Sequence, residues 1–459
     1  MTRPLNILLI LTDQQNADSL SCGGNPNVQT PNLNSLASRG VRFENAYCTN
    51  PRCSPSRKSM LSGQMPSRLG TVDNRTGDLT PWRDEVRSAT IGWLLRNAGY
   101  ACFYGGKWNA GGGISLPDPN VLDFGFKRLH GFDDFGLADA CIDFLSSNPI
   151  QPFLLMASFD NPHNICEAGS DRPLQWGEIA DAPLAQYPNL PPNFQPSPYE
   201  PQAIEDRRAN LGDLMAMKYS FDRWRKYRHD YYRLVEKADG EIGRILCALK
   251  GSALLTNTVV IFTSDHGEMN AAHRLGHKQV LYEESIGVPL IISDPQGEQR
   301  GTVVSDLVST GLDLVPTICD FAGLNIPQNL RGRSLRSRIL GNSDSSDDCD
   351  RLHKGHSYLI AETRHGSSKP FDGRMVRTKR YKYICYNRGR QPEQLFDLSL
   401  DPGEMVNMAV EDRHRPILDE HRRLLIEWCS QTGDNFGHHY ARPGAFAVPG
   451  VGFLPLSET

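Results

Sequence analysis

Short apolar runs recur along the chain before residue 300 and alternate with stretches of helical periodicity. Their length and composition are typical of buried strands. The predicted strands are Asn6 to Thr12, Tyr100 to Tyr104, Phe153 to Phe159, Val259 to Ser264 and Val288 to Ser293. Because strands that alternate with helices build parallel sheets with helices on both faces, this pattern predicts an α/β fold with a large, mainly parallel sheet.

The strongest helical pattern covers about Asp230 to Leu249. Its apolar residues follow the i, i+3, i+4, i+7 spacing of a stripe that faces a core. This stripe consists of Tyr231, Val235, Ala238, Ile242, Ile245 and Leu249. In open α/β sheets, ligands bind at the carboxyl ends of the strands, so the residues directly after each predicted strand are the candidates for a functional site.

Two segments interrupt the alternation of strands and helices. The stretch 161–219 is rich in proline, which removes backbone donors and fixes φ, so it is predicted to be a surface loop that serves as a lid or a binding loop. The stretch 341–350, with the sequence GNSDSSDDCD, is polar and acidic and is predicted to be a domain boundary. We therefore expect an N-terminal catalytic domain, 1–345, and a smaller C-terminal subdomain, 346–459.

The C-terminal part has shorter strand-like runs and one closing helix. The runs lie at Ser357 to Ile360, Arg374 to Arg377, Tyr381 to Tyr386 and Gln394 to Leu398, and the helix at Pro416 to Cys429. This order predicts an α+β subdomain that is built on an antiparallel sheet.

Charge and hydropathy narrow the classes of function. The formal net charge is -4, so no broad positive field would attract nucleic acid or an anionic membrane, and we expect neither as a partner. The apolar run Leu5 to Leu11 is too short to cross a bilayer and lacks the small-residue cleavage site of a signal peptide. The chain as written is therefore expected in the cytoplasm, or in the periplasm or outside the cell if an export signal has been removed.

The cysteines direct attention to one short segment. Eleven are scattered along the chain without a C-x-x-C pair, which argues against a disulfide framework and against structural zinc. One of them stands in NPRCSPSRKSMLSG, where Cys53, Pro55, Ser56 and Arg57 spell C-x-P-S-R. Taken alone, these residues are also compatible with a turn that leads into a helix and with a merely buried Cys53.

This segment resembles the signature of the sulfatase family. The resemblance implies that a formylglycine-generating enzyme oxidises Cys53 to formylglycine, whose hydrated aldehyde presents two hydroxyls on one carbon. One hydroxyl is expected to attack sulfur, and the other later to expel sulfate. Arg57, one helical turn after the nucleophile, would hold the hydroxyl and the sulfate oxygens as a fixed cation.

Two further blocks, each after a predicted strand, resemble the metal ligands of the family. TDQQ supplies Asp13 and Gln14, and TSDHGE supplies Asp265 and His266; with Cys53 they are expected to surround one divalent metal ion. Mostly oxygen ligands suit a hard cation, and the resemblance points to Ca²⁺, with Mg²⁺ as the alternative. By itself, TDQQ is equally compatible with an ordinary helix cap.

The segment GGKW, from Gly105 to Trp108, resembles the family's GKWH-x-G block, which implies that Lys107 binds the sulfate. At the histidine position of this block the chain has Asn109. In the family this histidine is expected to remove the proton of the second hydroxyl. Either another group takes that role here, or Asn109 orients the diol while a neighbour acts as the base. Without the other blocks, Lys107 is also compatible with a solvated side chain in a glycine-rich turn.

Two more candidates concern the leaving group. His163 in SFDNPHN matches the family's PH segment, and the resemblance implies that it protonates the leaving alcohol. Lys278 in HKQVLYEES matches K-x-x-x-Y-E-x-S and would neutralise the bridging oxygen as the S–O bond breaks. A lone histidine after a proline is more often structural, and Lys278 with Glu283 could form a surface ion pair, so only the whole set of blocks favours the catalytic interpretation.

The resemblance therefore implies an enzyme that hydrolyses a sulfate ester, with a sulfated sugar or polysaccharide fragment as the substrate. One alternative is a phosphonate monoester or phosphodiester hydrolase of the same alkaline-phosphatase-like superfamily, because chemistry on phosphorus and sulfur shares most of this site. Another is a catalytically impaired, carbohydrate-binding relative, which Asn109 alone favours. The sequence does not indicate which sugar or which sulfated position is recognised.

Overall fold

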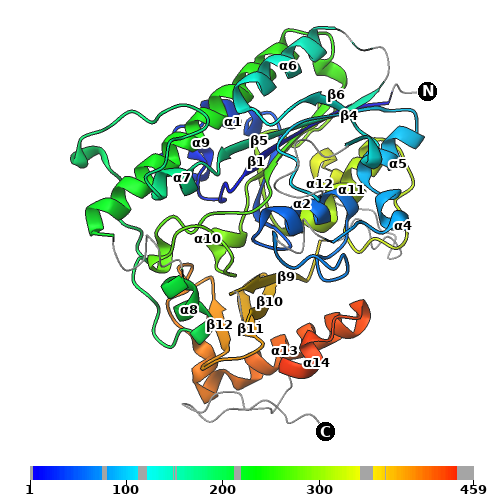
Figure 1. Cartoon of the computed structure of the whole chain (residues 1–459). Helices are drawn as coiled ribbons and strands as arrows, with labels where there is room; N and C mark the ends of the chain where they lie inside the picture. Colours follow the sequence, from blue (N-terminus) through cyan, green and yellow to red (C-terminus); the bar gives the residue numbers. More distant parts are fainter. Residues whose placement is uncertain are drawn as a thin grey trace.

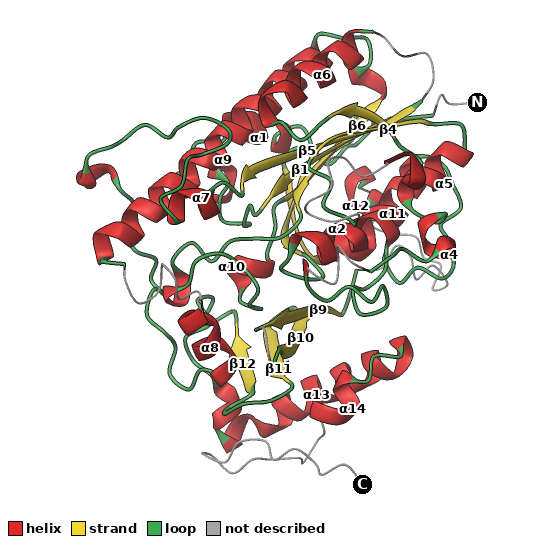
Figure 2. Ribbon diagram, in the orientation of Figure 1, coloured by secondary structure: helices red, strands yellow, loops and turns green. Residues whose placement is uncertain are grey.

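The computed structural model describes residues 4–74, 80–111, 121–147, 149, 152–210, 219–341, 355–366 and 369–441. The chain folds around an eight-stranded sheet and a four-stranded sheet (Figures 1 and 2). Apart from Gly341, the predicted boundary at 341–350 lies outside the described residues. The division at residue 345 therefore stays a prediction.

The large sheet is mixed and mostly parallel. Its strands, in spatial order, are β4 (Lys127–His130), β3 (Ala101–Gly106), β5 (Phe153–Pro162), β1 (Asn6–Asp13), β6 (Thr258–Ser264), β7 (Leu290–Ser293), β2 (Val41–Tyr47) and β8 (Thr302–Ser309). The strands from β4 to β6 are all parallel, whereas β7 runs antiparallel to both β6 and β2. The predicted α/β class and all five predicted strands are confirmed; β2, β4 and β8 were not predicted.

Both faces of the large sheet are covered by helices. Every residue of β1 is buried, and its side chains alternate between two apolar clusters, with Leu9 in one and Leu8 in the other. One face carries α1 (Pro31–Ala37), α6 (Asp134–Ser146) and α9 (Phe221–Lys250), and the other carries α2 (Cys53–Ser62), α5 (Ile91–Asn97) and α11 (Thr310–Phe321) (Figure 1). A strand buried on both faces reads as a continuous apolar run, which is why β1 was recognisable from the sequence.

The long helix α9 begins nine residues before the predicted start at Asp230. Its extension is amphipathic, because Trp224, Tyr227 and Tyr231 are buried together. The hydroxyl of Ser220 caps the first turn by accepting a hydrogen bond from the Arg223 N–H at 3.2 Å. The aromatic and basic run at 223–233 therefore packs against a core, as expected for a helix rather than for a nucleic-acid surface.

The four-stranded sheet is antiparallel, as predicted. Its order is β12 (Glu393–Asp397), β11 (Tyr381–Tyr386), β10 (Phe371–Thr378) and β9 (Tyr358–His365), and it packs against α13 (Arg415–Thr432), which α14 (Phe436–Tyr440) follows. Side chains on its other face, such as Met375 and Phe396, join the main apolar cluster of the large sheet. The two sheets therefore share one continuous core.

Polar contacts fasten the small sheet to the start of helix α10 (Glu283–Ile286) and to the loop that precedes it. The buried Lys382 ammonium on β11 lies 3.0 Å from the Glu283 carboxylate and 2.7 Å from that of Glu404. The Thr363 hydroxyl on β9 donates to the Gln279 carbonyl at 2.6 Å. Because an unpaired buried charge is strongly unfavourable, the two ion pairs of Lys382 fix the positions of Glu283 and Glu404.

The proline-rich stretch 161–219 is not loop throughout. It contains α7 (Ile165–Gly169) and α8 (Gln202–Asn210), and residues 211–218 lie outside the described residues. The remaining short helices are α4 (Asp84–Arg87), α10 (Glu283–Ile286) and α12 (Arg336–Leu340). Among the described residues, no helix is both long enough and apolar enough to cross a membrane.

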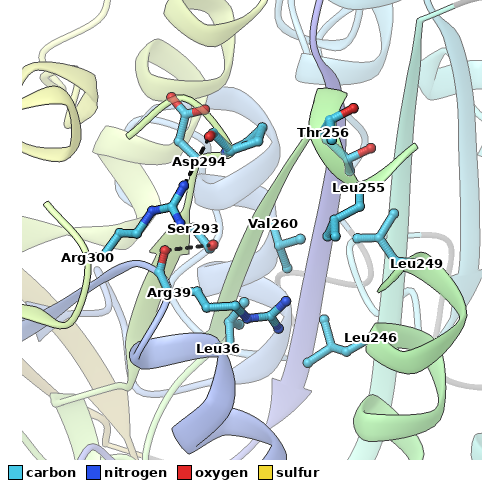
Figure 3. Close-up of a pocket in the computed structure, with 12 residues that line it drawn as sticks. Leu36, Arg39, Leu246, Leu249, Leu255, Thr256, Val260, Ser293, Asp294 and Arg300 are labelled. Atoms are coloured by element: carbon cyan, nitrogen blue, oxygen red, sulfur yellow. Dashed lines mark hydrogen bonds between the residues drawn. The ribbon is translucent and has the colours of Figure 1, made fainter. Parts of the chain in front are cut away.

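A cavity of about 210 Å³ lies between α1, α9 and the paired strands β6 and β7 (Figure 3). Leu246 and Leu249 of α9, Val260 of β6 and Ser293 of β7 line it. The Ser293 hydroxyl donates to the Arg39 carbonyl at 3.2 Å. Since the cavity lies at the amino end of β6, it is at the opposite end of the sheet from Asp265, which follows that strand.

Buried His365 gives the docking of the small sheet a pH dependence. Its Nε2 donates to the Ala203 carbonyl of α8 at 2.9 Å, and burial lowers the pKa of its imidazole to about 4. The unfolded chain takes up this proton near pH 6.5, so the free energy of unfolding falls by about 3 kcal/mol as the pH falls from about 6.5 to 4. In His365→Gln, chemical denaturation at pH 7 and pH 4.5 should show a smaller difference than in the wild type. An unchanged difference would contradict this assignment.

Candidate active site

The predicted site residues meet at the carboxyl ends of four neighbouring strands. Asp13 ends β1, Lys107 follows β3, His163 follows β5 and Asp265 follows β6. These strands are adjacent in the order β3-β5-β1-β6. The sheet therefore brings together residues that are up to 252 positions apart, as the end-of-strand argument anticipated.

Cys53 is the first residue of α2, and its side chain is 1% exposed. Its Sγ lies 3.2 Å from His266 Nε2, 3.3 Å from Lys278 Nζ and 3.6 Å from Asp13 Oδ1. The amino end of a helix carries partial positive charge, so α2 adds to the charge of Lys278 beside this position. An oxyanion bound here would be stabilised by both.

Arg57 lies one turn after Cys53 and joins three strand ends. Its guanidinium donates to Asp265 Oδ2 at 2.8 Å, to Asp13 Oδ2 at 3.1 Å and to the Lys107 carbonyl at 2.7 Å. Because both carboxylates are completely buried, a fixed, permanently charged partner is needed to keep them ionised. Arg57 thus fixes the positions of the acids around Cys53.

Lys107 is positioned by the glycine before it. Gly106 has φ 87°, and a Cβ at this position would lie 2.0 Å from the Ser158 carbonyl oxygen, so only glycine fits. The chain then turns so that the Lys107 ammonium lies 2.9 Å from Asp13 Oδ2 and 2.8 Å from Asp160 Oδ1. Lys107 therefore belongs to the ionic network of the site and is not a solvated surface lysine.

Four side chains form a group that fits a metal ion. The ligand atoms of Asp13, Cys53, Asp265 and His266 all lie within 4.8 Å of one another and are buried. His266 Nδ1 lies 2.9 Å from the Gly267 carbonyl, so it carries the proton, and Nε2 directs its lone pair at the carboxylates. The Oδ1 atoms of Asp13 and Asp265 lie 3.7 and 3.6 Å from Nε2. Lone pairs that converge in this way repel one another unless a cation lies between them.

The charges around this group agree with a cation site. Burial alone would raise the pKa of Asp13, but Lys107, Lys278 and Arg57 outweigh it and hold this pKa well below the usual range. Burial and the neighbouring Asp13 raise the pKa of Asp265 to about 6. Burial lowers the pKa of His266 to about 4, so its ring is neutral, as a metal ligand must be.

Gln14 lies beside this group in a left-handed backbone conformation, with φ 72°. Its backbone N–H donates to Asp265 Oδ1 at 3.1 Å, and its amide oxygen accepts from Lys278 Nζ at 2.5 Å. Its amide nitrogen donates to Glu268 Oε2 at 2.5 Å. In this arrangement Gln14 connects β1 to Asp265 and orients Lys278, and its role as a metal ligand stays a prediction.

His163 and Asn109 lie at the edge of the site. The His163 side chain is 26% exposed, and its Nδ1 is 3.9 Å from Asp160 Oδ1. Burial, Lys107 and Lys278 lower the pKa of His163 well below its usual range, so the resting ring is neutral. Asn109 is half-buried with φ 39°, a conformation that asparagine tolerates better than most residues.

Two acids of the site were missed by the sequence analysis. Asp160 binds Lys107, accepts from Trp176 Nε1 at 2.9 Å and faces His163, although only its place at a strand end signalled it. Glu268 accepts from Gln14 and from the Tyr227 hydroxyl at 2.8 Å. It stands in the TSDHGE block, but nothing in the sequence indicated that it would buttress a different strand end.

The assembled site can hold a tetrahedral oxyanion at Cys53. Arg57, Lys107 and Lys278 supply three cations, and the group around Asp13 supplies a place for a fourth. In a buried site such preorganised charges stabilise negative charge far more than they would in water. The chemistry that the geometry supports is therefore the displacement of an anionic group from a tetrahedral centre.

Comparison with known proteins agrees with this geometry. Residues 5–324 match the family model described as Sulfatase, and residues 271–431 match the model described as N-sulphoglucosamine sulphohydrolase, C-terminal. A Delta 4,5-hexuronate-2-O-sulfatase of Bacteroides thetaiotaomicron is 31% identical, over 94% of this chain and 90% of that protein. The structure of a 2-O GAG sulfatase superposes with a TM-score of 0.81 at 29% identity, over 95% and 94% of the two chains.

The fold is also shared with enzymes that act on phosphorus. The phosphonate monoester hydrolase of Agrobacterium radiobacter superposes with a TM-score of 0.75 over 95% of this chain and 97% of that one, but at 20% identity. A likeness at this level establishes the common fold alone. The family model and the 31% identical relative are more specific, and together with the site they show that the chain belongs to the sulfatase family and is a sulfuric ester hydrolase.

Proposed function

We propose that this enzyme hydrolyses a sulfate ester on a uronate-containing carbohydrate, through a formylglycine made from Cys53 and with Ca²⁺ as the metal ion. The observation that carries the proposal is the position of Cys53 at the start of α2, within 3.6 Å of Lys278, His266 and Asp13. The name of the 31% identical relative, a hexuronate-2-O-sulfatase, supports the substrate class.

The formylglycine explains why the site is built around a cysteine. A sulfated serine would be a stable ester, whereas a sulfated aldehyde hydrate collapses by elimination and releases sulfate without a second attack on sulfur. Maturation then requires a formylglycine-generating enzyme as a partner. In the mature site, the two hydroxyls would occupy the region of Cys53 Sγ, 3.3 Å from Lys278 Nζ, and Lys278 and Arg57 would hold the sulfate oxygens by charge-assisted hydrogen bonds.

The donor set favours a hard divalent cation. Asp13 and Asp265 supply carboxylate oxygens, and the Gln14 amide oxygen lies nearby, which suits Ca²⁺. The ion would supply Lewis-acid stabilisation of charge on the sulfate. The formylglycine in place of the Cys53 thiol changes the ligand from sulfur to oxygen, which suits Ca²⁺ better than the thiol does.

His163 is proposed to protonate the leaving alcohol. Together with burial, Lys107 and Lys278 lower the pKa of His163, and the negative charge of a sulfate bound between them would offset their effect. Substrate binding would therefore favour the protonated ring. His163→Ala should lower kcat about 10²- to 10⁴-fold on a sugar sulfate and far less on 4-nitrophenyl sulfate, whose leaving group needs no proton. Steady-state kinetics on both substrates checks this, and equal losses would remove His163 from the acid role.

A direct assay tests the proposed substrate class. The enzyme, coexpressed with a formylglycine-generating enzyme, is offered an unsaturated 2-O-sulfated uronate disaccharide, 4-nitrophenyl sulfate and a phenylphosphonate monoester at equal concentration. We expect kcat/KM to be highest for the disaccharide, measured by sulfate release. Preference for the phosphonate monoester would favour the alternative within the superfamily, and binding of the disaccharide without turnover would favour an impaired, carbohydrate-binding protein.

A further inference from the structure

Two arginines outside the set described so far lie directly beside groups that contact Cys53. Arg52 is the N-cap residue of α2 and precedes the nucleophile in the chain. Arg207, on α8 of the proline-rich segment, donates from its guanidinium to the Lys278 carbonyl at 3.2 and 3.4 Å. One arginine is thus fixed to the nucleophile's helix and the other to the lysine that touches the nucleophile.

Among the described residues, neither arginine has an acidic partner at ion-pair distance. Arg207 is 9% exposed, and Arg52 Nε is enclosed without any hydrogen-bond partner among the described residues. Within that part of the chain, no carboxylate oxygen comes within 4 Å of either guanidinium. Cations that are shielded from water without a counter-charge are energetically unfavourable, so a bound anion would stabilise this arrangement.

Two other arginines provide a contrast. Arg208, the next residue along α8, pairs with the Glu200 carboxylate at 2.7 Å. Arg374, which is also buried, pairs with Asp434 at 2.7 Å. Arg208 and Arg374 therefore have acidic partners at ion-pair distance, whereas Arg52 and Arg207 have none among the described residues.

The two guanidinium groups also act on each other. Burial and the positive charge of Arg52 lower the pKa of Arg207 to about 9. The acid with the largest opposing effect on Arg207 is Glu268, which already accepts from Gln14, Tyr227 and the backbone of His277. Asp73 acts on Arg52 from beyond ion-pair distance. A bound anion would relieve the repulsion between the two cations.

We propose that Arg52 and Arg207 bind a second anionic group of the substrate, the carboxylate of the uronic acid whose sulfate reaches Cys53. This inference rests on the proposed function and assigns its substrate specificity to two residues. A planar carboxylate matches the fork of the guanidinium, and two forks that approach from α2 and α8 can hold both of its oxygens. The neighbouring imidazoles add no charge, because burial lowers the pKa of His277 to about 3 and that of His365 to about 4.

The test separates recognition of the carboxylate from catalysis at sulfur. Arg52→Gln and Arg207→Gln are each assayed on a 2-O-sulfated uronate, on its carboxyl methyl ester and on 4-nitrophenyl sulfate. We expect kcat/KM on the uronate to fall about 10- to 100-fold in each variant, mainly through KM, with much smaller losses on the ester and the aryl sulfate. In the wild type, the ester should already be the poorer substrate by a similar factor.

Controls distinguish loss of recognition from loss of structure. Arg390→Gln removes an exposed arginine that pairs with Glu205 of the same helix α8, and it should leave all three activities unchanged. Arg207→Lys, which keeps the charge but loses the fork, should fall between the wild type and Arg207→Gln. Equal losses on all three substrates in the arginine variants, or none on the uronate, would overturn the proposal.

A binding experiment tests the role of Arg207 independently of whether the enzyme hydrolyses the sulfate ester. Titration calorimetry with the 2-O-sulfated uronate is carried out on Cys53→Ala and on Cys53→Ala combined with Arg207→Gln. We expect binding about 10- to 100-fold weaker in the double variant, even if no sulfate ester is turned over by the parent enzyme. Unchanged affinity would refute the role of Arg207. A further outcome is that the affinity for a disulfated sugar without a carboxylate falls more on loss of Arg207 than the affinity for the uronate does. That result would show that the two arginines bind a second sulfate and not a carboxylate.

Discussion

Cys53→Ala is expected to lower sulfate ester hydrolysis by at least about 10⁴-fold, because it removes the atom from which the nucleophile is made. The cations around that atom are left in place: Lys278 lies 3.3 Å from its sulfur, and Arg57 lies one turn later on the same helix. Binding of the sulfated sugar should be retained, because the cations that hold the sulfate are still present. Initial rates and calorimetric binding on the purified variant measure the two effects separately.

Cys247→Ala is the matched control for this experiment. Cys247 is an exposed, free cysteine near the end of α9, at the opposite end of the sheet from the site, so its removal should leave the rate unchanged. The melting temperature of both variants should stay within a few degrees of the wild type, because neither replacement opens a large cavity. Substantial turnover in Cys53→Ala would contradict the mechanism.

Asp13→Asn is expected to have the second largest effect, a loss of about 10³-fold or more in kcat/KM. The Asp13 carboxylate is fully buried and serves both Arg57 and Lys107 while facing His266 and Cys53. The amide keeps the shape but removes the negative charge, so the divalent cation loses a ligand and two buried cations lose their counter-charge. Metal content, measured by inductively coupled plasma mass spectrometry, should fall together with activity.

Metal removal from the wild type provides the comparison for Asp13→Asn. Dialysis against a chelator should abolish activity, and Ca²⁺ should restore it in the wild type but only weakly in the variant. Asp222→Asn, at an exposed position in the first turn of α9, should behave as the wild type in both assays. Full activity in a chelated enzyme that contains no measurable metal would exclude the proposed role of the cation.

The central strands could be predicted from the sequence because burial on both faces makes them continuous apolar runs. The strand β1, with the sequence NILLILTD, is buried throughout. In contrast, β4 has the sequence KRLH, and the first half of β8 alternates between exposed and half-buried residues. Strands at the edge of a sheet need less apolar side chains, so their pattern does not stand out from loops.

Site residues were predictable from the sequence where they belong to a recognisable motif, and most clearly where that motif follows a predicted strand. Asp13, Lys107 and Asp265 follow predicted strands, and their motifs identified them. The contacts of Arg207 with the Lys278 carbonyl and of Lys382 with Glu283 depend instead on how α8 and the small sheet pack, and no local pattern encodes such packing. Tertiary contacts of this kind decide the shape of the substrate site, which is why the sequence left the sugar open.

Mass spectrometry of the proteolytic peptide that contains Cys53 tests directly whether this residue becomes formylglycine. The protein is expressed alongside an active formylglycine-generating enzyme, and the peptide is examined for conversion of the thiol to the aldehyde or its hydrate. We expect most of the peptide to carry formylglycine and the converted fraction to track the rate of sulfate release. A protein that hydrolyses sulfate esters while Cys53 remains an unmodified cysteine would contradict this expectation.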